Sequence, residues 1–484
     1  MTGRSDKSPT KRAPFLYLPV EVAARELDAK LLTTHFAVAA GFEVIIGQKW
    51  LMQKNIGRMP AGIMLFKTLT TVDAGFMRAA REHGHAIASV DEEIPGLIAR
   101  NEGLRWVAPA AVETCDLIFA VGEEHKQALL WRFPEHRDKY VVAGNPRWDL
   151  LRQEFIGSHA EEVTRIRRDS GRFLLINTNL GFINSGKGTT DQMVRKLERG
   201  GKFDRRRPDD AEFLAQHLRL EHASLEGIKA LLPRRAEGFP DHQFVVRPHP
   251  SENATTWQAI VDRLPRTQVV RRGSVVPWIL ATDCLIHTYC TTGVEAFALG
   301  KPAICFQPDY AAIIENYLSP RINFLAKTAD DVVGRLRQLV DADMMTFTYP
   351  AEFQAAFDRS FAAQSGAFAA ERIIQQLAER FHVALSSSAT SAQWRPARGY
   401  VRYILSKAHN RRLMPAITAE ALAGRLTSFG RTLGQPRPTA VEPCGDRMFH
   451  IHGHPQADHA ANTAGSPTLL PRWMRRLAGT VGTS

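Results

Sequence analysis

The chain has 484 residues, which is too long for a single hydrophobic core and predicts two domains and an additional segment. Apolar residues make up 44% and charged residues 23%, so we expect a soluble globular protein, and no apolar run is long enough to cross a bilayer. The net charge of +12 is concentrated in residues 386–484, which carry 13 Arg and Lys against 4 Asp and Glu, so the rest of the chain lacks the basic surface of a nucleic-acid-binding protein.

Short apolar runs alternate with helical patterns in residues 14–156. Because strands separated by helices pair in parallel, this stretch predicts a Rossmann-like, doubly wound sheet. The expected helices include 25–40 and 75–82. The expected strands are 15–19, 43–46, 62–66, 86–90, 116–120 and 140–143.

A second alternation follows a charged stretch at 157–171 that we interpret as a linker. It predicts a second Rossmann-like domain at 170–383, with a helical stretch at 351–381 closing it. Two such domains facing each other form the GT-B arrangement, so the expected fold class is α/β, GT-B. The expected strands are 173–176, 244–246, 267–270, 284–286 and 303–306, with helices at 211–232 and from Thr328 onward.

Residues 384–484 change in composition and predict a basic, largely irregular and partly disordered tail with one helical candidate at 399–412. His450, His452, His454 and His459 lie close together in this tail. Without an ordered scaffold around them, we interpret them as adventitious ligands and expect no metal site.

The five cysteines are scattered without metal-ligand spacing, which favours free thiols in a reducing compartment. No apolar stretch follows the polar N-terminus, so we expect no secretory signal and a cytoplasmic location.

Arg247, His249, Pro250 and Ser251 follow the predicted strand at 244–246. In an open α/β sheet, ligands bind beyond the carboxyl ends of the strands. Guanidinium and imidazolium groups are charge-assisted donors to phosphate oxygens, and His249 could stabilise charge that grows on a departing phosphate. These residues therefore predict a nucleotide-phosphate site; the alternative is a surface turn with ordinary charges.

His287 ends the predicted strand at 284–286, and Thr291, Thr292 and Gly293 open the next helix. Free backbone N–H groups and the helix dipole bind phosphate at such a position. Glu295, one turn further on, is placed to accept hydrogen bonds from ribose hydroxyls. The alternative is a plain helix cap with a buried glycine contact.

Asn177, Thr178, Asn179 and Gly181 follow the first strand of the second domain, where small residues allow a phosphate to approach the backbone. Residues 181–188 nearly spell a P-loop. We disfavour an NTPase because Gly188 replaces the magnesium-binding hydroxyl residue and the acidic strand end precedes the loop.

Asp91 and Glu92 follow the predicted strand at 86–90. A carboxylate at this strand end could act as a general base or as a nucleophile at an anomeric carbon, and we favour Asp91 over Glu92. A solvated acidic turn is the alternative.

Asn145 and Arg147 follow the last strand of the first domain. They could line the acceptor side of the cleft or form the domain junction.

Residues 14–380 resemble the bacterial surface carbohydrate biosynthesis proteins. The motifs that carry the resemblance are Arg25 to Asp28 (RELD), Gly144 to Asp149 (GNPRWD), Asn177 to Asn179 (NTN) and Val246 to Asn253 (VRPHPSEN). The resemblance implies a metal-independent GT-B glycosyltransferase of capsule or lipopolysaccharide synthesis. Because an Arg/His-Pro motif with a Ser/Thr-rich helix start is typical of sialyl- and Kdo-transferases, it also implies a CMP-linked donor such as CMP-Kdo.

The expected partners are a nucleotide-sugar donor and a glycan or lipid-linked glycan acceptor, with no cofactor and no nucleic acid. The basic stretch 395–412 could dock on an anionic inner-membrane surface. Two alternatives remain open at this point: a glycerol-phosphate transferase or sugar epimerase on the same scaffold, and a non-catalytic polysaccharide-assembly factor.

Overall fold

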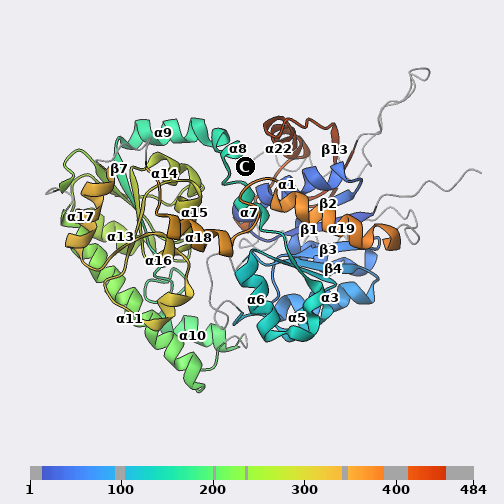
Figure 1. The fold of residues 1–484 in the computed structure, drawn as a ribbon, viewed down its shortest axis with the longest axis horizontal. Helices are drawn as coiled ribbons and strands as arrows, with labels where there is room; N and C mark the ends of the chain where they lie inside the picture. The colour runs from blue at the N-terminus through green and yellow to red at the C-terminus, as the bar shows by residue number, and fades with distance from the viewer. Residues whose placement is uncertain are drawn as a thin grey trace, which may run out of the picture. The chain divides into compact units, whose positions relative to one another are not determined.

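A computed structural model describes residues 14–92, 104–199, 203–234, 238–340, 347–385 and 412–453. Two β-sheets organise these residues, and helices cover both faces of each sheet (Figure 1). In the described part of the chain, no helix is long and apolar enough to cross a membrane.

The first sheet has eight strands in the order β13-β14-β2-β1-β3-β4-β5-β6. The six strands from the first part of the chain are parallel to one another. Their bounds match the predicted runs closely: β1 Phe15–Val20, β2 Glu43–Gln48, β3 Gly62–Phe66, β4 Ala86–Val90, β5 Leu117–Ala120 and β6 Tyr140–Val142.

Side chains alternate between two cores along the strands of the first sheet. In β1, Leu16 and Leu18 enter one core while Phe15 and Tyr17 enter the other. Burial on both faces explains why this strand is an unbroken apolar run. The helices on the first face are α1 Ala23–Ala39, α8 Gln153–Ile156, α19 Ala369–Leu385 and α22 Ala419–Thr432; those on the second are α2 Lys49–Lys54, α3 Thr71–Glu82, α5 Pro109–Thr114 and α6 Glu123–Arg132.

The second sheet has six parallel strands in the order β12-β11-β10-β7-β8-β9. Five match predicted strands, and the short edge strand β12 was not predicted. The strands are β7 Phe173–Asn177, β8 Gln243–Arg247, β9 Thr267–Val269, β10 Cys284–His287, β11 Ala303–Phe306 and β12 Phe324–Ala326.

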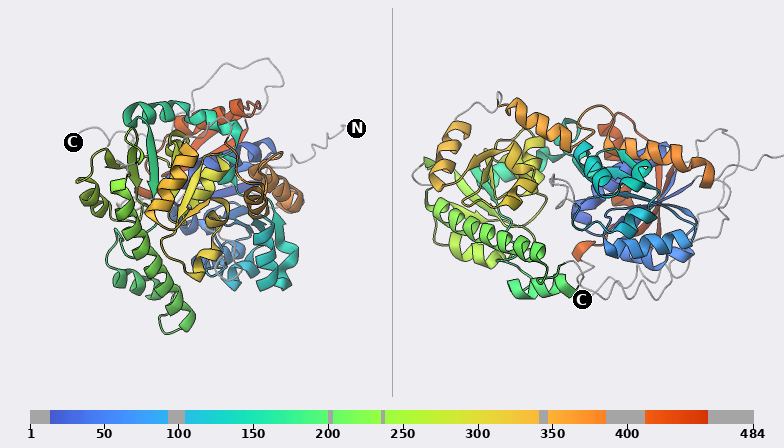
Figure 2. Two further views of the ribbon diagram at one scale, coloured as in Figure 1. Left: turned by 60° about the vertical axis from the view of Figure 1, so that its left-hand side comes forward. Right: turned by 60° about the horizontal axis from the view of Figure 1, so that its bottom comes forward.

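Helices on the two faces of the second sheet include the long helix α11, which runs as one continuous rod (Figure 2). One face carries α9 Ala160–Ser170, α14 Val276–Ala281, α15 Thr291–Ala298, α16 Ser319–Ile322 and α18 Ala351–Ser360. The other carries α11 Pro208–Leu231, α13 Ala254–Val261 and α17 Ala329–Val340, while α10 Thr190–Arg199 precedes α11. Two Rossmann-like sheets in tandem confirm the α/β, GT-B prediction.

The charged stretch interpreted as a linker is largely the helix α9. Ile166 on this helix is buried in the core of the second sheet. The Arg167 guanidinium donates to the carbonyls of Leu280 and Ala281 at 3.4 and 3.3 Å. The high charge misled the interpretation because it occupies the exposed face of an amphipathic helix.

The helical stretch expected to close the second domain divides into α18 and α19, which belong to different cores. Phe357 of α18 packs under the second sheet, whereas Ile373 and Leu377 of α19 pack with α1 under the first sheet. The Asp149 carboxylate accepts hydrogen bonds from the N–H groups of Ala369 and Ala370 at 2.9 and 2.8 Å, so it fixes the start of α19.

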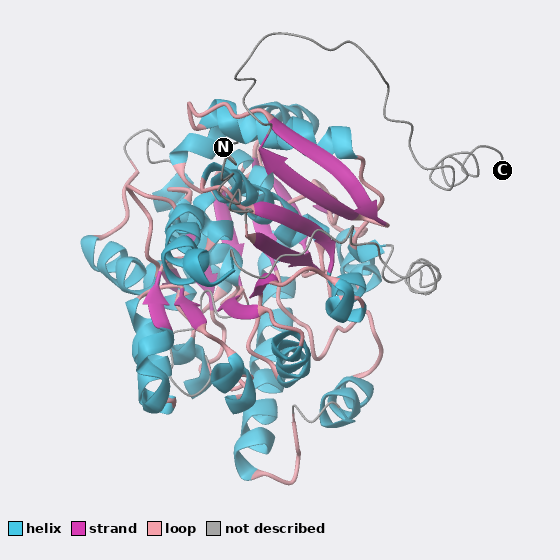
Figure 3. Ribbon diagram, turned by 90° about the vertical axis from the view of Figure 1, so that its right-hand side faces the viewer, coloured by secondary structure: helices cyan, strands magenta, loops and turns pink. Residues whose placement is uncertain are grey.

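Part of the expected irregular tail is ordered, which corrects that expectation for residues 412–453. The helix α22 packs on α1, and the hairpin of β13 Thr439–Gly445 and β14 Met448–Gly453 extends the first sheet through antiparallel pairing of β14 with β2 (Figure 3). Phe449 and Ile451 alternate into one core while Met448 enters the other. The helical candidate at 399–411 and the segment 454–484 lie outside the described residues.

Candidate functional site

The direction of strand order reverses once in each sheet. In the second sheet the reversal falls between β7 and β10, whose last residues Asn177 and His287 are register partners. In the first sheet it falls between β1 and β3. In open α/β sheets, the crevice beyond the strand ends at such a reversal is the usual ligand site. Residues predicted from the sequence therefore occupy the reversal point of the second sheet.

A buried carboxylate, Glu252, joins the segments after β7 and β8. Oε1 accepts hydrogen bonds from Thr178 Oγ1 at 2.7 Å, Leu180 N at 3.1 Å and His249 N at 3.0 Å. Oε2 accepts from Trp257 Nε1 at 2.9 Å and Asn184 Nδ2 at 3.2 Å. Glu252 is part of the VRPHPSEN motif but was assigned no role from the sequence. An acidic residue directly after the predicted loop could have indicated that it holds that loop in place.

His249 lies on this organised loop with a fixed ring orientation. Ser251 N donates to its Nδ1 at 3.2 Å, and Ser251 Oγ lies 2.7 Å from the same atom. Since Nδ1 accepts, the proton of the neutral ring is on Nε2. Burial by neighbouring groups lowers the pKa of His249 although one side of the ring is exposed, and Glu252 opposes this shift while Arg25 and Lys187 add to it. His249 therefore presents an Nε2–H donor at neutral pH.

Arg247, which was expected to bind phosphate together with His249, has other contacts. Its guanidinium donates to the carbonyls of Arg272 and Gly273, both at 2.8 Å, and lies 5.7 Å from the ring centroid of Trp278. The structure thus uses Arg247 to hold the loop after β9. Pro250 is exposed, and its carbonyl accepts a hydrogen bond from Arg271 at 3.0 Å.

The helix α15 begins directly beside the end of β10. Cys290 is the N-cap residue, and its side chain forms no capping hydrogen bond with the described helix start. Thr291 is exposed and Thr292 half-buried at the first turn. A Cβ on Gly293 would lie 2.3 Å from His287 Nε2, so only glycine permits this approach of helix to strand. Gly293 N donates to the Cys290 carbonyl at 3.1 Å, so the N–H groups of Thr291 and Thr292 are the ones placed to face an anion at this helix start.

His287 is a structural residue. It is fully buried, and its Nε2 lies 2.8 Å from Asn323 Oδ1. Burial lowers its pKa to about 4, which keeps the ring neutral. The expectation of direct nucleotide contact is therefore replaced by a positioning role: His287 sets the distance between β10 and α15.

Several buried polar atoms belong to residues at the ends of β7 and β10 and on α15. Among the described residues, Asn177 Oδ1, Thr288 Oγ1 and Glu295 Oε2 are buried without a hydrogen-bond partner. Burial raises the pKa of Glu295, while Arg147 and Arg25 of the first half of the chain lower it. Buried polar atoms without partners are rare in proteins and mark places where a ligand or water completes the bonding.

The acidic pair of the first half is placed as expected, after β4, and both side chains are buried. Glu92 forms an ion pair with Lys30 at 3.0 Å, and its carbonyl accepts from Arg147 Nη1 at 3.5 Å. Asn145 donates to the Asp91 carbonyl at 3.3 Å and caps α7 Pro146–Asp149 by accepting from Arg147 N at 2.9 Å. The ion pair with Lys30 neutralises Glu92, which makes Glu92 a weaker candidate for a reacting carboxylate.

A buried ion cluster at the reversal point of the first sheet was missed by sequence analysis. Lys67, after β3, contacts Glu21 at 3.0 Å and Glu26 at 2.9 Å. Lys49, after β2, contacts Asp73 at 2.8 Å. These carboxylates raise the pKa of Lys67 and outweigh its burial. The usable signal was a charged residue directly after each of three apolar strands.

The P-loop-like segment is attached to the loop after β8. Gly186 N donates to the Ser251 carbonyl and Asn253 N to the Asn184 carbonyl, both at 2.7 Å. Gly181 lies beside Ser251, and Asn179 is half-buried next to it. The segment is therefore held against the loop that carries His249.

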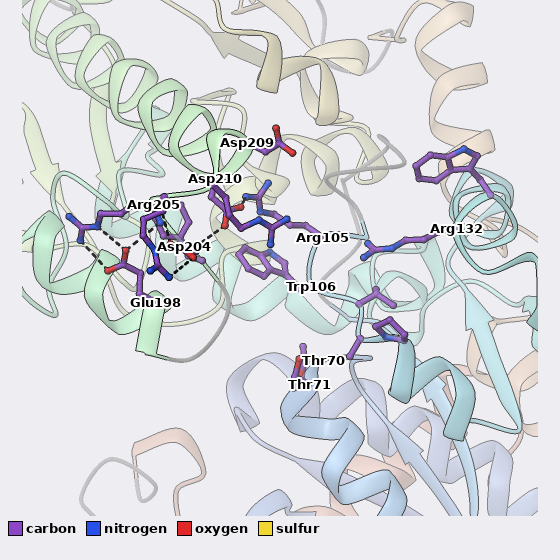
Figure 4. A pocket seen from close by; sticks show the side chains of 17 residues that line it. Thr70, Thr71, Arg105, Trp106, Arg132, Glu198, Asp204, Arg205, Asp209 and Asp210 are labelled. Carbon is purple, nitrogen blue, oxygen red and sulfur yellow. Dashed lines mark hydrogen bonds and ion pairs between the residues drawn. The ribbon is translucent and has the colours of Figure 1, made fainter.

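A cavity of about 1030 Å³ is lined by other residues (Figure 4). Trp106 and Trp131, exposed by 36% and 52%, lie in it with Arg132. The ion pair of Arg105 with Asp210 crosses from the loop after β4 to α11. This cavity was not predicted, because its residues come from several loops and from the ends of α3, α5, α6, α10 and α11, which are far apart in the sequence.

No protein-family model matches the chain, and no curated protein matches it. Solved structures with a related fold include the wall teichoic acid polymerase TagF, at 12% identity and a TM-score of 0.47 over 77% of this chain and 90% of that one. Two UDP-GlcNAc 2-epimerases are similar: that of Neisseria meningitidis, at 14% identity and a TM-score of 0.47 over 76% and 100%, and another at 15% and 0.48 over 79% and 99%. Similarity at this level leaves the activity to be argued from the chain itself.

Proposed function

We propose that the protein is a glycosyltransferase of bacterial surface polysaccharide synthesis that uses a nucleotide-activated sugar. The observation that carries this proposal is the set of unpartnered buried polar atoms at the strand-order reversal of the second sheet, beside the uncapped start of α15. Donors and acceptors together at such a point suit a nucleotide, which offers both phosphate oxygens and ribose hydroxyls.

Each residue has a chemical task in this proposal. The first-turn N–H groups of α15, the Thr291 hydroxyl and the His249 Nε2–H donate to the leaving phosphate and stabilise the charge that develops on it. Glu295 accepts from a ribose hydroxyl. Arg147 contributes positive charge from the first half, consistent with its effect on the pKa of Glu295.

Asp91 acts as the general base that accepts the proton of the acceptor hydroxyl, so that the sugar–phosphate bond breaks as the new glycosidic bond forms.

The cavity of Figure 4 provides the acceptor site, since exposed tryptophans stack on sugar rings and arginines bind acidic sugars. The donor we favour is CMP-linked, with an acidic ulosonic sugar such as Kdo.

Calorimetric titration with CMP, CDP and UDP tests the proposal. We expect selective binding of CMP, weakened by at least about tenfold in His249→Ala, which corresponds to about 1.4 kcal/mol for a charge-assisted hydrogen bond. The exposed His222→Ala is the matched control. Selective binding of UDP would discard the CMP donor, and absence of nucleotide binding would favour a non-catalytic assembly factor.

Activity requires a separate measurement. Release of CMP from CMP-Kdo in the presence of extracted surface glycan should depend on Asp91, and Asp91→Asn should abolish release without weakening CMP binding. Conversion of a UDP-sugar to its epimer, or consumption of CDP-glycerol, would instead identify one of the alternative activities. Membrane docking by residues 395–412 stays a prediction, because nearly all of that stretch lies outside the described residues.

A further inference from the structure

Four potential metal ligands lie on three adjacent strands at the edge of the first sheet. His450 and His452 are two residues apart on β14, so they share one face of the strand. Glu442 of β13 is the register partner of His450. Glu43 begins β2, the neighbour of β14 on its other side. These histidines were expected in an irregular tail; for His450 and His452 that expectation is wrong, whereas His454 and His459 lie outside the described residues.

The distances among Glu442, His450 and His452 fit one ion, whereas Glu43 is close to His450 alone. The ligand atoms of Glu442, His450 and His452 all lie within 4.8 Å of one another. His450 Nε2 is 2.8 Å from Glu43 Oε2, and His452 Nε2 is 3.6 Å from Glu442 Oε1. Ligand atoms of a tetrahedral site with zinc bonds of about 2.0–2.1 Å are roughly 3.3 Å apart, so the separation of His452 from Glu442 needs only a small side-chain adjustment.

The orientation of His452 also suits a metal. Its Nδ1 lies 3.1 Å from the Gly453 carbonyl, to which only a protonated nitrogen can donate. In the neutral ring this leaves the lone pair on Nε2, the atom that faces Glu442. A backbone carbonyl bound to the second ring nitrogen is the usual support of a metal-ligating histidine.

We propose that Glu442, His450 and His452 bind a divalent transition-metal ion of the zinc class. Two imidazoles and one carboxylate form a nitrogen-rich donor set that prefers Zn²⁺ to Mg²⁺ or Ca²⁺, which are bound by oxygen alone, and water would fill the fourth position. The ion would tie β13 to β14, beside Glu43 of β2, so its role is structural. The site is separate from the nucleotide site, and neither proposal depends on the other.

The test is titration of the full chain, with any affinity tag removed, with Zn²⁺ while Tm and heat are recorded. We expect one ion per chain and a Tm that rises with Zn²⁺ concentration. His452→Ala and the more conservative Glu442→Gln, both at partly exposed positions, should weaken binding by about tenfold or more. Co²⁺ in place of Zn²⁺ should give the intense visible absorption of a tetrahedral site.

Two controls separate this site from other histidines. His222→Ala, on the exposed face of α11, should bind Zn²⁺ as the unaltered chain does. The double variant His454→Ala/His459→Ala should also retain binding. Loss of binding in that double variant, unchanged binding in both His452→Ala and Glu442→Gln, or no Zn²⁺ binding by the unaltered chain would overturn the proposal.

Discussion

At the scale of single residues, one glycine sets how closely α15 approaches β10. A Cβ on Gly293 would lie 2.3 Å from His287 Nε2 and 2.4 Å from Asn323 Oδ1. Neither neighbour can move freely, because the two are bonded to each other in the core. The start of α15 is therefore held in place by a contact that no larger residue allows.

Gly293→Ala should lower the free energy of unfolding by about 1–3 kcal/mol, the usual cost of overpacking, and weaken CMP binding because it displaces the start of α15. Gly334→Ala is the control, since nothing lies within 4 Å of a Cβ there and alanine favours a helix. Denaturant unfolding and calorimetry measure both effects. Equal stability of the two variants would contradict the packing argument.

A second residue, Glu221, makes stability depend on pH. It accepts hydrogen bonds from the N–H groups of Phe182 and Ile183 at 2.9 Å, and burial raises its pKa from 4.5 to about 7. The folded state therefore binds a proton that the unfolded state has released between these values. This contribution to stability is complete below pH 4.5 and is lost as the pH rises through 7.

Glu221→Gln should remove that dependence. Relative to the unaltered chain, the variant should gain on the order of 3 kcal/mol in free energy of unfolding between pH 4.5 and pH 8. Urea unfolding at several pH values measures it, with the exposed Glu226→Gln on the same helix as control. A constant difference between variant and unaltered chain would show that Glu221 is charged in both states.

At the scale of elements, α19 depends on a carboxylate from another part of the chain. Asp149 accepts from two N–H groups of the first turn of α19, which packs against α1. Asp149→Ala should lower the free energy of unfolding by about 1–2 kcal/mol, as the loss of a helix cap does. The exposed Asp358→Ala should stay within about 0.5 kcal/mol. Two equal effects in denaturant unfolding would argue against this capping role.

The sequence pattern predicted those elements that can be recognised from their own residues alone. The strands β1 and β7 could be located because burial on both faces leaves a continuous apolar run. The loop from Arg247 to Ser251 could then be located because it follows such a run. The sequence could not show which sheet α19 packs against, since the apolar face of this helix fits either sheet. The hairpin of β13 and β14 was hidden because its core-facing residues Met448, Phe449 and Ile451 are interrupted and flanked by histidines and polar residues.

Site residues divided in a similar way. Position after a strand predicted site roles for His249 and Asn177, which stay predictions, but it could not show that Arg247 would be used by backbone carbonyls or that His287 would be buried. Those outcomes depend on neighbours about 20–40 residues distant in the chain, which periodicity does not encode.

At the scale of the whole molecule, both sheets reverse their strand order at a point where charged or polar side chains gather. At the first, Lys67 pairs with Glu21 and Glu26, although Gln48 Nε2 and Ser89 Oγ have no hydrogen-bond partner within the described residues. At the second, Asn177, Thr288 and Glu295 have unpartnered buried atoms in the same part of the chain. We propose that the nucleotide binds at the second reversal point and that the first half orients the acceptor.

A crystal soak with CMP tests this assignment most directly, because it locates the phosphate. The account predicts phosphate density at the first turn of α15, within hydrogen-bonding distance of His249 Nε2, and the ribose near Glu295. Phosphate density instead among Arg105, Trp106 and Arg205, in the cavity of Figure 4, would contradict it.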